Sequence, residues 1–283
     1  MIGGSQSGTE GPENRSVSAH YGRIDLVERI ITALRAAGKD PEALEAEDLA
    51  PVDQLHTRGR EATLKLARLA GARSGMRVLD VGGGLGGPAR TLASEFGCAV
   101  EVLDVTEELC LAGAALTART GLSHLVRFQH GSALEMPYQE ASFDLAWTQH
   151  SSMNIADKAR LYSEIRRVLK PGGRLALHEI MAGQTCPIRL PVPWAREPGI
   201  SHLERPERIR TLILASGFRE LAWTDETTLA AEWFRKRASR HRESPALSPH
   251  LLFGPDFPEM LENQARNLQE GRISILYAIF ERQ

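Results

Sequence analysis

Short apolar runs and stretches of helical periodicity alternate through the middle of the chain. The runs of strand length are 78–81, 99–104, 126–129, 143–147 and 174–180, and the helical stretches between them include 107–120 and 155–169. Strands that alternate with amphipathic helices are typical of parallel strands joined by crossover helices. The pattern therefore predicts an α/β fold built on a doubly wound, mostly parallel sheet.

The pattern changes after the fifth strand. Four prolines at 187, 191, 193 and 198 mark an irregular insertion at about 183–205. A helix over 206–216, a strand over 218–223, helical stretches at 228–241 and 257–270 and a last strand over 273–280 then follow. The two late strands bring the predicted sheet to seven strands.

The segment before the first strand is helical in its spacing. Residues 1–18 are rich in Gly, Ser, Glu and Asn, which predicts a disordered tail. Helical periodicity follows at 24–34 and 57–69. We therefore expect a helical cap over 19–75, placed across a ligand site of the domain at 76–283.

Composition narrows the classes of partner and compartment. The 283 residues carry a formal net charge of −2, which gives no electrostatic reason to expect nucleic acid or an anionic membrane. No apolar run is long enough to span a membrane, and the N-terminus lacks the apolar core of a signal peptide. The three cysteines are widely spaced, so we expect neither a disulfide framework nor a metal site, and a cytoplasmic location.

The most informative segment is the glycine cluster that follows the first strand. Five of the six residues at 82–87 are glycine, as backbone needs where it turns tightly against a bound nucleotide. A second strand ends about twenty residues later at Asp104, where a carboxylate can accept hydrogen bonds from ribose hydroxyls. The alternative for Asp104 is a helix N-cap or turn residue.

The glycine spacing leaves the nucleotide open. Gly82, Gly84 and Gly87 also fit the G-x-G-x-x-G of a dinucleotide site, so an NAD(P)-dependent oxidoreductase is one alternative. The helical cap and the late insertion favour a single nucleotide such as S-adenosylmethionine. A non-catalytic partner subunit that binds the cofactor is the other alternative.

The motifs, taken in order, resemble those of the class I S-adenosylmethionine-dependent methyltransferases. They are the glycine loop at 78–86, Asp104, the segment 131–137, Ser142-Phe143-Asp144 and Leu169-Lys170-Pro171-Gly172-Gly173. The segments 56–63 and 166–174 look like the small-molecule branch, which includes sarcosine/dimethylglycine, tocopherol and natural-product methyltransferases. The resemblance covers about residues 20–282 and is strong over 55–180.

The resemblance implies a set of cofactor contacts. The implied residues are Asp80, Gly82, Gly83, Gly84, Gly86, Asp104, Val105, Ser132, Ala133, Gln149 and Arg60. Gly82, Gly84 and Gly86 would line the methionine half, and Arg60 would pair with its carboxylate unless it is a surface helix arginine. The family usually has aspartate at the position of Ser132, so the adenine contact is uncharged here and a modest cofactor affinity is expected.

A sulfonium methyl is already electrophilic, so alignment of the acceptor supplies much of the acceleration and a base is needed only for an acceptor that loses a proton. The candidates at strand ends are Glu179 and His150. Their structural alternatives are a salt bridge to an arginine of the insertion for Glu179 and a turn or capping role for His150. Tyr21, His56, His178, Trp194 and His202 are candidates for substrate binding, although His178 and Trp147 also suit the core.

The acceptor is predicted from the apolar residues of the insertion. Ile188, Leu190, Val192 and Trp194 would form an apolar wall, which favours a small apolar or aromatic metabolite of secondary metabolism, methylated on C, N or O. A glycine- or sarcosine-type amine is the alternative, with Arg189 or Arg196 for its carboxylate. A homodimer through the N-terminal helices or the last strand is a further expectation.

Overall fold

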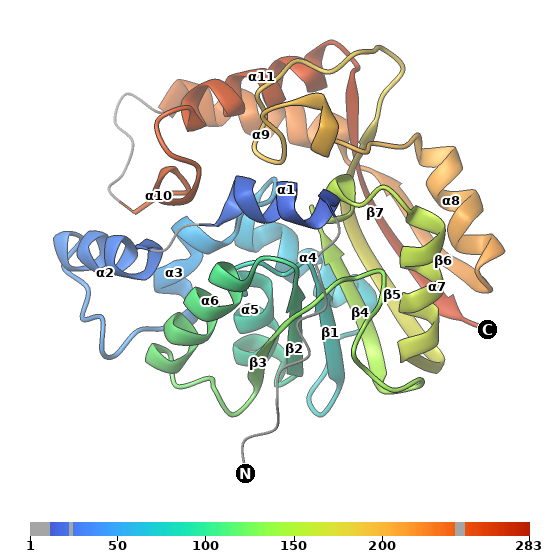
Figure 1. Ribbon diagram of the computed structural model, residues 1–283, viewed down its shortest axis with the longest axis horizontal. Helices are drawn as coiled ribbons and strands as arrows, with labels where there is room; N and C mark the ends of the chain where they lie inside the picture. Colours follow the sequence, from blue (N-terminus) through green and yellow to red (C-terminus); the bar gives the residue numbers. More distant parts are fainter. Residues whose placement is uncertain (1–11, 23–24, 241–246) are drawn as a thin grey trace.

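A seven-stranded sheet runs through the centre of the computed structural model, which describes residues 12–22, 25–240 and 247–283 (Figure 1). The strand order is β3-β2-β1-β4-β5-β7-β6. The strands are β1 (Arg77–Val81), β2 (Ala99–Asp104), β3 (Val126–His130), β4 (Phe143–Gln149), β5 (Leu169–Ala182), β6 (Phe218–Asp225) and β7 (Ile273–Arg282).

The first five strands are parallel, and β7 runs antiparallel between β5 and β6. The prediction of a doubly wound, mostly parallel sheet of seven strands is confirmed. The strand order reverses between β1 and β4, because the chain leaves β1 toward β2 and returns on its other side to β4. Ligands of open α/β sheets bind at the carboxyl ends of the strands at such a switch point.

Helices cover both faces of the sheet and one end of it. They are α1 (Pro12–Tyr21), α2 (Leu26–Ala36), α3 (Ala46–Asp53), α4 (Gly59–Ala70), α5 (Gly87–Phe96), α6 (Glu107–Arg119), α7 (Lys158–Val168), α8 (Pro206–Ala215), α9 (Thr227–Arg240), α10 (His250–Phe253) and α11 (Phe257–Gln269). Two one-turn 3-10 helices are η1 (Ser152–Asn154) and η2 (Pro198–Ile200).

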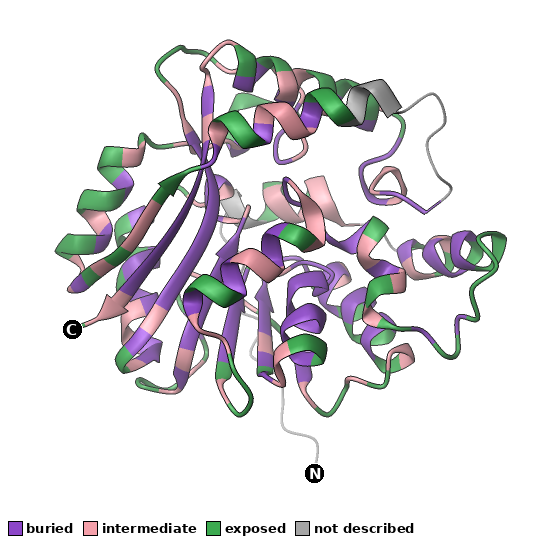
Figure 2. Ribbon diagram, turned by 180° about the vertical axis from the view of Figure 1, so that it is seen from behind, coloured by how far each residue is buried: buried purple, intermediate pink, exposed green. Residues whose placement is uncertain are grey.

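The two faces of the sheet form separate cores because successive strand residues point to opposite sides. Leu79 and Val81 pack in the core that α7 and α8 cover, whereas Val78 packs in the core that α4 and α5 cover. Figure 2 shows the central strands as almost wholly buried. Both cores are apolar, so the polar groups at the strand ends define the functional side of the molecule.

The N-terminal segment departs from the prediction of a tail. Helix α1 begins at Pro12, so residues 12–18, which the composition assigns to disorder, are helical, and residues 1–11 lie outside the described part. Apolar residues of α2 pack with residues of α10 and α11 in a third cluster, which joins the cap to the late helices. The division into a cap at 19–75 and a domain at 76–283 stays a prediction.

Strand β7 affects the expectation of a dimer through the last strand. It pairs with β5 along one edge and with β6 along the other, so this strand has no free edge for a second copy. Edge-to-edge pairing of β7 is therefore not available for a dimer, and the expectation of a homodimer stays a prediction. None of the described helices is both long enough and apolar enough to cross a membrane.

Candidate active site

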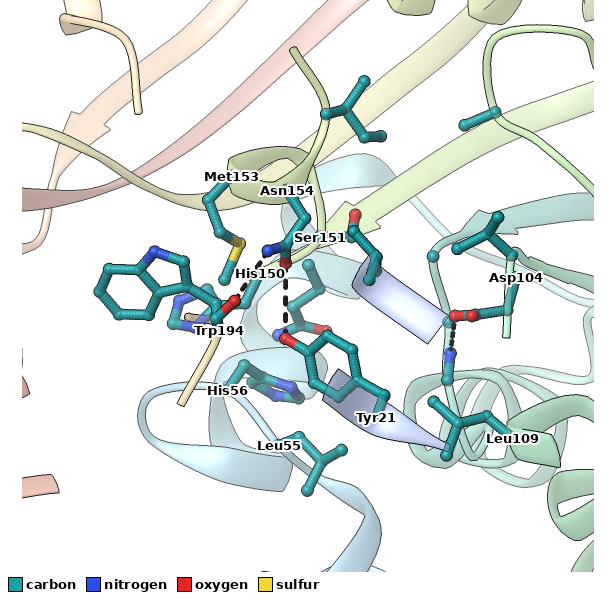
Figure 3. Close-up of a pocket in the computed structure, with 18 of the residues that line it drawn as sticks. Tyr21, Leu55, His56, Asp104, Leu109, His150, Ser151, Met153, Asn154 and Trp194 are labelled. Carbon is teal, nitrogen blue, oxygen red and sulfur yellow. Dashed lines mark hydrogen bonds between the residues drawn. The ribbon is translucent and has the colours of Figure 1, made fainter. Parts of the chain in front are cut away.

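A cavity lies at the carboxyl ends of β1, β2 and β4, under α1 (Figure 3). It holds about 1270 Å³ of empty space, part of it open to solvent. The sheet supplies one wall, the insertion another, and the cap closes it from the side of α1 and α3.

The glycine loop forms the floor of the cavity. Gly82 and Gly84 have φ values of +70° and +54°, which only glycine adopts at little cost. A Cβ on Gly82 would lie 2.5 Å from the Cβ of Ser151, so the loop also needs glycine for space. The Gly84 N–H donates to Asp104 Oδ2 at 2.8 Å. This bond ties the loop to the end of β2.

Asp104 has a fixed orientation at the edge of the cavity. Its second oxygen accepts the Thr106 N–H at 2.9 Å, and only 8% of the residue is exposed. Burial raises the pKa of Asp104, and its two backbone hydrogen bonds oppose that rise. Asp104 thus lines the cavity in a fixed orientation, and its contact with a ribose stays a prediction.

Asp80 lies below the loop and does not line the cavity. Its Oδ2 has no hydrogen-bond partner among the described residues. Burial, and next the charge of Asp104, raise the pKa of Asp80 to about 8. A Cβ on Gly83 would sit 2.6 Å from this oxygen, so Asp80 packs directly against the loop, and its role as a cofactor contact stays a prediction.

The cavity is acidic. Asp53 and Asp104 are the charged residues of its described lining, which contains no lysine or arginine. Asp53 Oδ2 pairs with Arg90 at 2.7 Å, while its Oδ1 is buried without a partner in the described ranges. Burial raises the pKa of Asp53, and Arg90 opposes this. Such a lining suits a ligand that carries positive charge.

Three buried histidines stand together at the back of the cavity. The ring centroid of His150 lies 4.6 Å from that of His178 and 6.1 Å from that of His56. Burial lowers the pKa of His56 to about 4 and the pKa values of the other two well below 6.5. All three imidazoles are therefore neutral at pH 7.

His150 has both a strained backbone conformation and a ring nitrogen without a hydrogen-bond partner in the described chain. Its φ is +52°, an uncommon value for a residue with a Cβ. Its Nε2 has no hydrogen-bond partner anywhere in the described chain, although the residue lines the cavity. Strained backbone and an orphaned polar atom at a cavity wall point to a functional role for His150.

His178 stands behind the cavity wall. Its Nδ1 accepts a hydrogen bond from Gln149 Nε2 at 3.2 Å, and its ring stacks on Tyr277 at 4.2 Å. Gln149 in turn accepts the Trp147 indole N–H at 3.2 Å. This arrangement places Gln149 at the cavity and His178 and Trp147 in the packed layer behind it.

Glu179 lies on the opposite face of β5, outside the cavity lining. It accepts the backbone N–H of Ser151 at 3.5 Å and that of Ser152 at 3.3 Å. Burial raises the pKa of Glu179 to about 6, and these bonds limit the rise. Glu179 therefore holds the loop that carries His150. The alternative, a salt bridge to an arginine of the insertion, is not formed: Arg189 pairs with Glu270, and Arg196 pairs with Asp256.

Helix α1 lies across the cavity and forms hydrogen bonds to two of its walls. Ser18 Oγ donates to the Val105 carbonyl at 3.1 Å, and the His20 ring bonds the Pro193 carbonyl at 2.9 Å. The Tyr21 hydroxyl donates to Asn154 at 3.4 Å (Figure 3). Thus α1 touches the end of β2 and the proline-rich insertion at once.

The structure brings most predicted site residues to one cavity. Those that line it are Gly82, Gly83, Gly84, Asp104, Val105, Ser132, Ala133, Gln149, His150, Tyr21, His56 and Trp194. Arg60 does not, because its guanidinium pairs with Glu95 at 2.5 Å, as in the surface alternative. Gly86 faces the ring of Phe128. His202 is not part of the lining, although its backbone N–H donates to the carbonyl of Met153, which is.

Several lining residues were not predicted from the sequence. They include Val17, Asp53, Ser151, Met153, Asn154, Phe253 and Gln264. Asp53 is the last residue of α3, and Phe253 the last of α10. Their positions depend on how the cap packs against the sheet, which periodicity does not reveal. The end of the predicted strand at 143–147 was the available sequence signal in this region, and it pointed to Gln149 and His150.

Comparisons with known proteins show which domain the chain contains. Residues 79–177 match the family described as methyltransferase domain. The sarcosine/dimethylglycine N-methyltransferase of Halorhodospira halochloris is 28% identical over 218 residues, which is 77% of this chain and 77% of that protein.

Solved structures resemble the fold as a whole. Geranyl diphosphate C-methyltransferase from Streptomyces coelicolor A3(2), in complex with Mg²⁺, geranyl diphosphate and S-adenosyl-L-homocysteine, superposes with a TM-score of 0.68 at 18% identity, covering 96% of this chain and 98% of that one. The [4+2]-cyclase SpnF superposes with a TM-score of 0.67 at 22% identity, covering 95% and 96%. These likenesses concern the fold, and SpnF illustrates that one fold hosts different chemistry.

Proposed function

Because this chain contains a methyltransferase domain, we propose that it transfers the methyl group of S-adenosylmethionine to a small, uncharged, apolar or aromatic metabolite by in-line displacement. The observation that carries the proposal is the charge of the cavity. Its described lining has two carboxylates, neutral imidazoles and no lysine or arginine.

The residues present fit the cofactor. When bound, S-adenosylmethionine supplies an electrophilic methyl group on a positively charged sulfur. Asp104 would accept the ribose hydroxyls, and the partnerless Oδ1 of Asp53 would accept the methionine ammonium group. The positive φ of Gly82 and Gly84 lets the backbone approach the ligand. Ser132 and Ala133 line the region where the resemblance puts the adenine.

The same lining argues against an anionic acceptor. A carboxylate or phosphate taken out of water needs a cationic partner, and arginine is the usual one. Arg189 and Arg196, the residues considered for a carboxylate, are committed to Glu270 and Asp256 at the surface. This favours an uncharged acceptor over a glycine- or sarcosine-type amine.

His150 would act on the acceptor side. Its neutral imidazole has an Nε2 that no described residue bonds, so it can accept a hydrogen bond or a proton from the acceptor. Gln149 and His178 pack behind it, and Glu179 fixes its loop. We assign Glu179 a positioning role, because its carboxylate faces backbone N–H groups rather than the cavity. Trp194 and Tyr21 would form the aromatic wall.

The proposal is tested first by calorimetric titration of the full chain with S-adenosylmethionine, S-adenosylhomocysteine and NAD(H). We expect both sulfur nucleotides to bind and NAD(H) to stay unbound. In Asp104→Ala, loss of a charge-assisted contact of about 1.5–3 kcal/mol weakens binding about 10- to 100-fold. Binding of NAD(H) alone would contradict the proposal.

The acceptor class is tested by a methylation screen. Neutral phenols, amines and activated carbon acids are compared with sarcosine and phosphoethanolamine, with S-adenosylhomocysteine release as the readout. We expect turnover of neutral acceptors and a drop of about 10²–10⁴-fold in kcat for His150→Ala with an acceptor that loses a proton. Preferential turnover of the anionic acceptors would refute the assignment.

A further inference from the structure

A second cavity of about 610 Å³ lies beside the first. It is lined by the end of α3, the start of α4 and the late helices α9, α10 and α11, and part of it is open to solvent. The sequence analysis did not anticipate it, and the contacts described so far leave it without a role.

The two cavities meet at a common wall. Five residues line both of them: Leu55, His56, Pro193, Phe253 and Gln264. His56 is the reference point, because its ring centroid is 6.1 Å from that of His150. A ligand that occupied both cavities would therefore have to pass His56 and the other shared residues.

The second cavity is aromatic and uncharged. The Trp233 and Phe234 rings meet edge to face at 4.9 Å, and the Phe253 and Phe257 rings stack at 5.3 Å. Its described lining contains no aspartate, glutamate, lysine or arginine. Apolar walls with a few neutral polar groups favour an aromatic or aliphatic ligand that carries no charge.

We propose that this second cavity binds an uncharged aromatic or aliphatic arm of the methyl acceptor, so that one acceptor spans both cavities and reacts at the His150 end. The inference rests on the proposed function and adds to it the shape of the substrate. The cofactor stays in the first cavity, over the glycine loop and Asp104. An acceptor limited to a single small ring would leave the second cavity unused.

The test uses a neutral fluorescent probe, N-phenyl-1-naphthylamine, with the full chain and saturating S-adenosylhomocysteine. We expect the probe to bind with the nucleotide still in place. Leu261→Trp fills the second cavity and should weaken the probe about tenfold, while the nucleotide Kd changes less than about twofold. Leu261 lines the second cavity and not the first.

Two controls sharpen the result. Leu214→Trp makes the same change on α8, where Leu214 is 43% exposed, and should leave both affinities unchanged. The probe's sulfonated counterpart, 1-anilinonaphthalene-8-sulfonate, should bind about tenfold more weakly because the cavity offers no cation. Thermal melting of each variant shows whether it folds.

Trp233→Leu is the second variant if Leu261→Trp does not fold. It removes an aromatic wall without adding volume, and we expect about threefold weaker probe binding. Displacement of the probe by the nucleotide would overturn the inference, and so would unchanged probe binding in the folded variant. Nucleotide binding does not depend on the second cavity. Failure of the nucleotide to bind would therefore contradict the proposed function and not this inference.

Discussion

Arg90 of helix α5 and Asp53 of helix α3 form an ion pair of 2.7 Å in which the side chains are 0% and 1% exposed. Arg90 also donates to the Leu85 carbonyl at 2.7 Å and to Thr117 Oγ1 at 2.7 Å. The pair thus joins the cap, the glycine loop and α6 at one buried point. It also fixes the Asp53 carboxylate at the edge of the cavity.

Arg90→Met should destabilise the fold strongly. Removing one partner leaves Asp53 buried without its counter-charge, which costs about 3–5 kcal/mol. Urea unfolding followed by circular dichroism measures this change in the free energy of unfolding. Arg266→Met removes an exposed pair with Glu262 and should cost less than about 1 kcal/mol. If Arg90→Met lowered the free energy of unfolding as little as Arg266→Met, the buried ion pair would not stabilise the fold.

Ser132→Asp should strengthen nucleotide binding. Ser132 lines the cavity and its Oγ accepts the Leu134 N–H at 3.2 Å, so an aspartate there could keep this bond. A charged acceptor makes a stronger hydrogen bond than a hydroxyl, by about 1 kcal/mol, or about fivefold in Kd for S-adenosylhomocysteine. Calorimetry measures it, with Ser132→Ala as the control. Equal affinities for all three proteins would remove Ser132 from the adenine contact.

Glu179→Gln should loosen the loop that carries His150. The amide side chain loses the charge that strengthens the bonds from the Ser151 and Ser152 N–H groups. Amide hydrogen exchange should therefore rise over 150–154 and stay unchanged in β1. The Kd for S-adenosylhomocysteine should stay within about twofold, because Glu179 does not line the cavity. Unchanged exchange over 150–154 would refute the positioning role.

His56 should make stability depend on pH. Burial lowers its pKa from 6.5 to about 4, so the folded state binds fewer protons than the unfolded state. Its contribution is complete above pH 6.5 and is lost as the pH falls toward 4, by about 3 kcal/mol in total. We expect the free energy of unfolding of wild type relative to His56→Asn to fall across this window. Asp80 has a raised pKa, so its contribution to the free energy of unfolding changes with pH in the opposite direction. Both proteins contain Asp80, so this contribution cancels in the difference between them.

A constant difference between wild type and His56→Asn from about pH 7 to pH 4 would contradict this assignment. It would mean that His56 titrates alike in the folded and unfolded chain.

The sheet was predictable because its signals are local. The apolar run at 99–104 coincides with β2 and ends on Asp104 at the cavity. Arg60 shows the limit of such reasoning: its place on an amphipathic helix was correct, but its pairing with Glu95, 35 residues away, depends on how α4 packs on α5. Helix α1 was missed because polar residues dominate it and hydrogen bonds to Val105 and Pro193 hold it.

The position of β7 constrains the order in which the strands can join the sheet during synthesis. Strand β6 leaves the ribosome before β7, yet it joins the sheet only through β7, which inserts between it and β5. The five parallel strands can pair while the rest of the chain is still being made, but β5 then has one edge uncovered. An uncovered strand edge invites pairing with other chains. The nascent protein is therefore most exposed to misassembly between the synthesis of β5 and the arrival of β7.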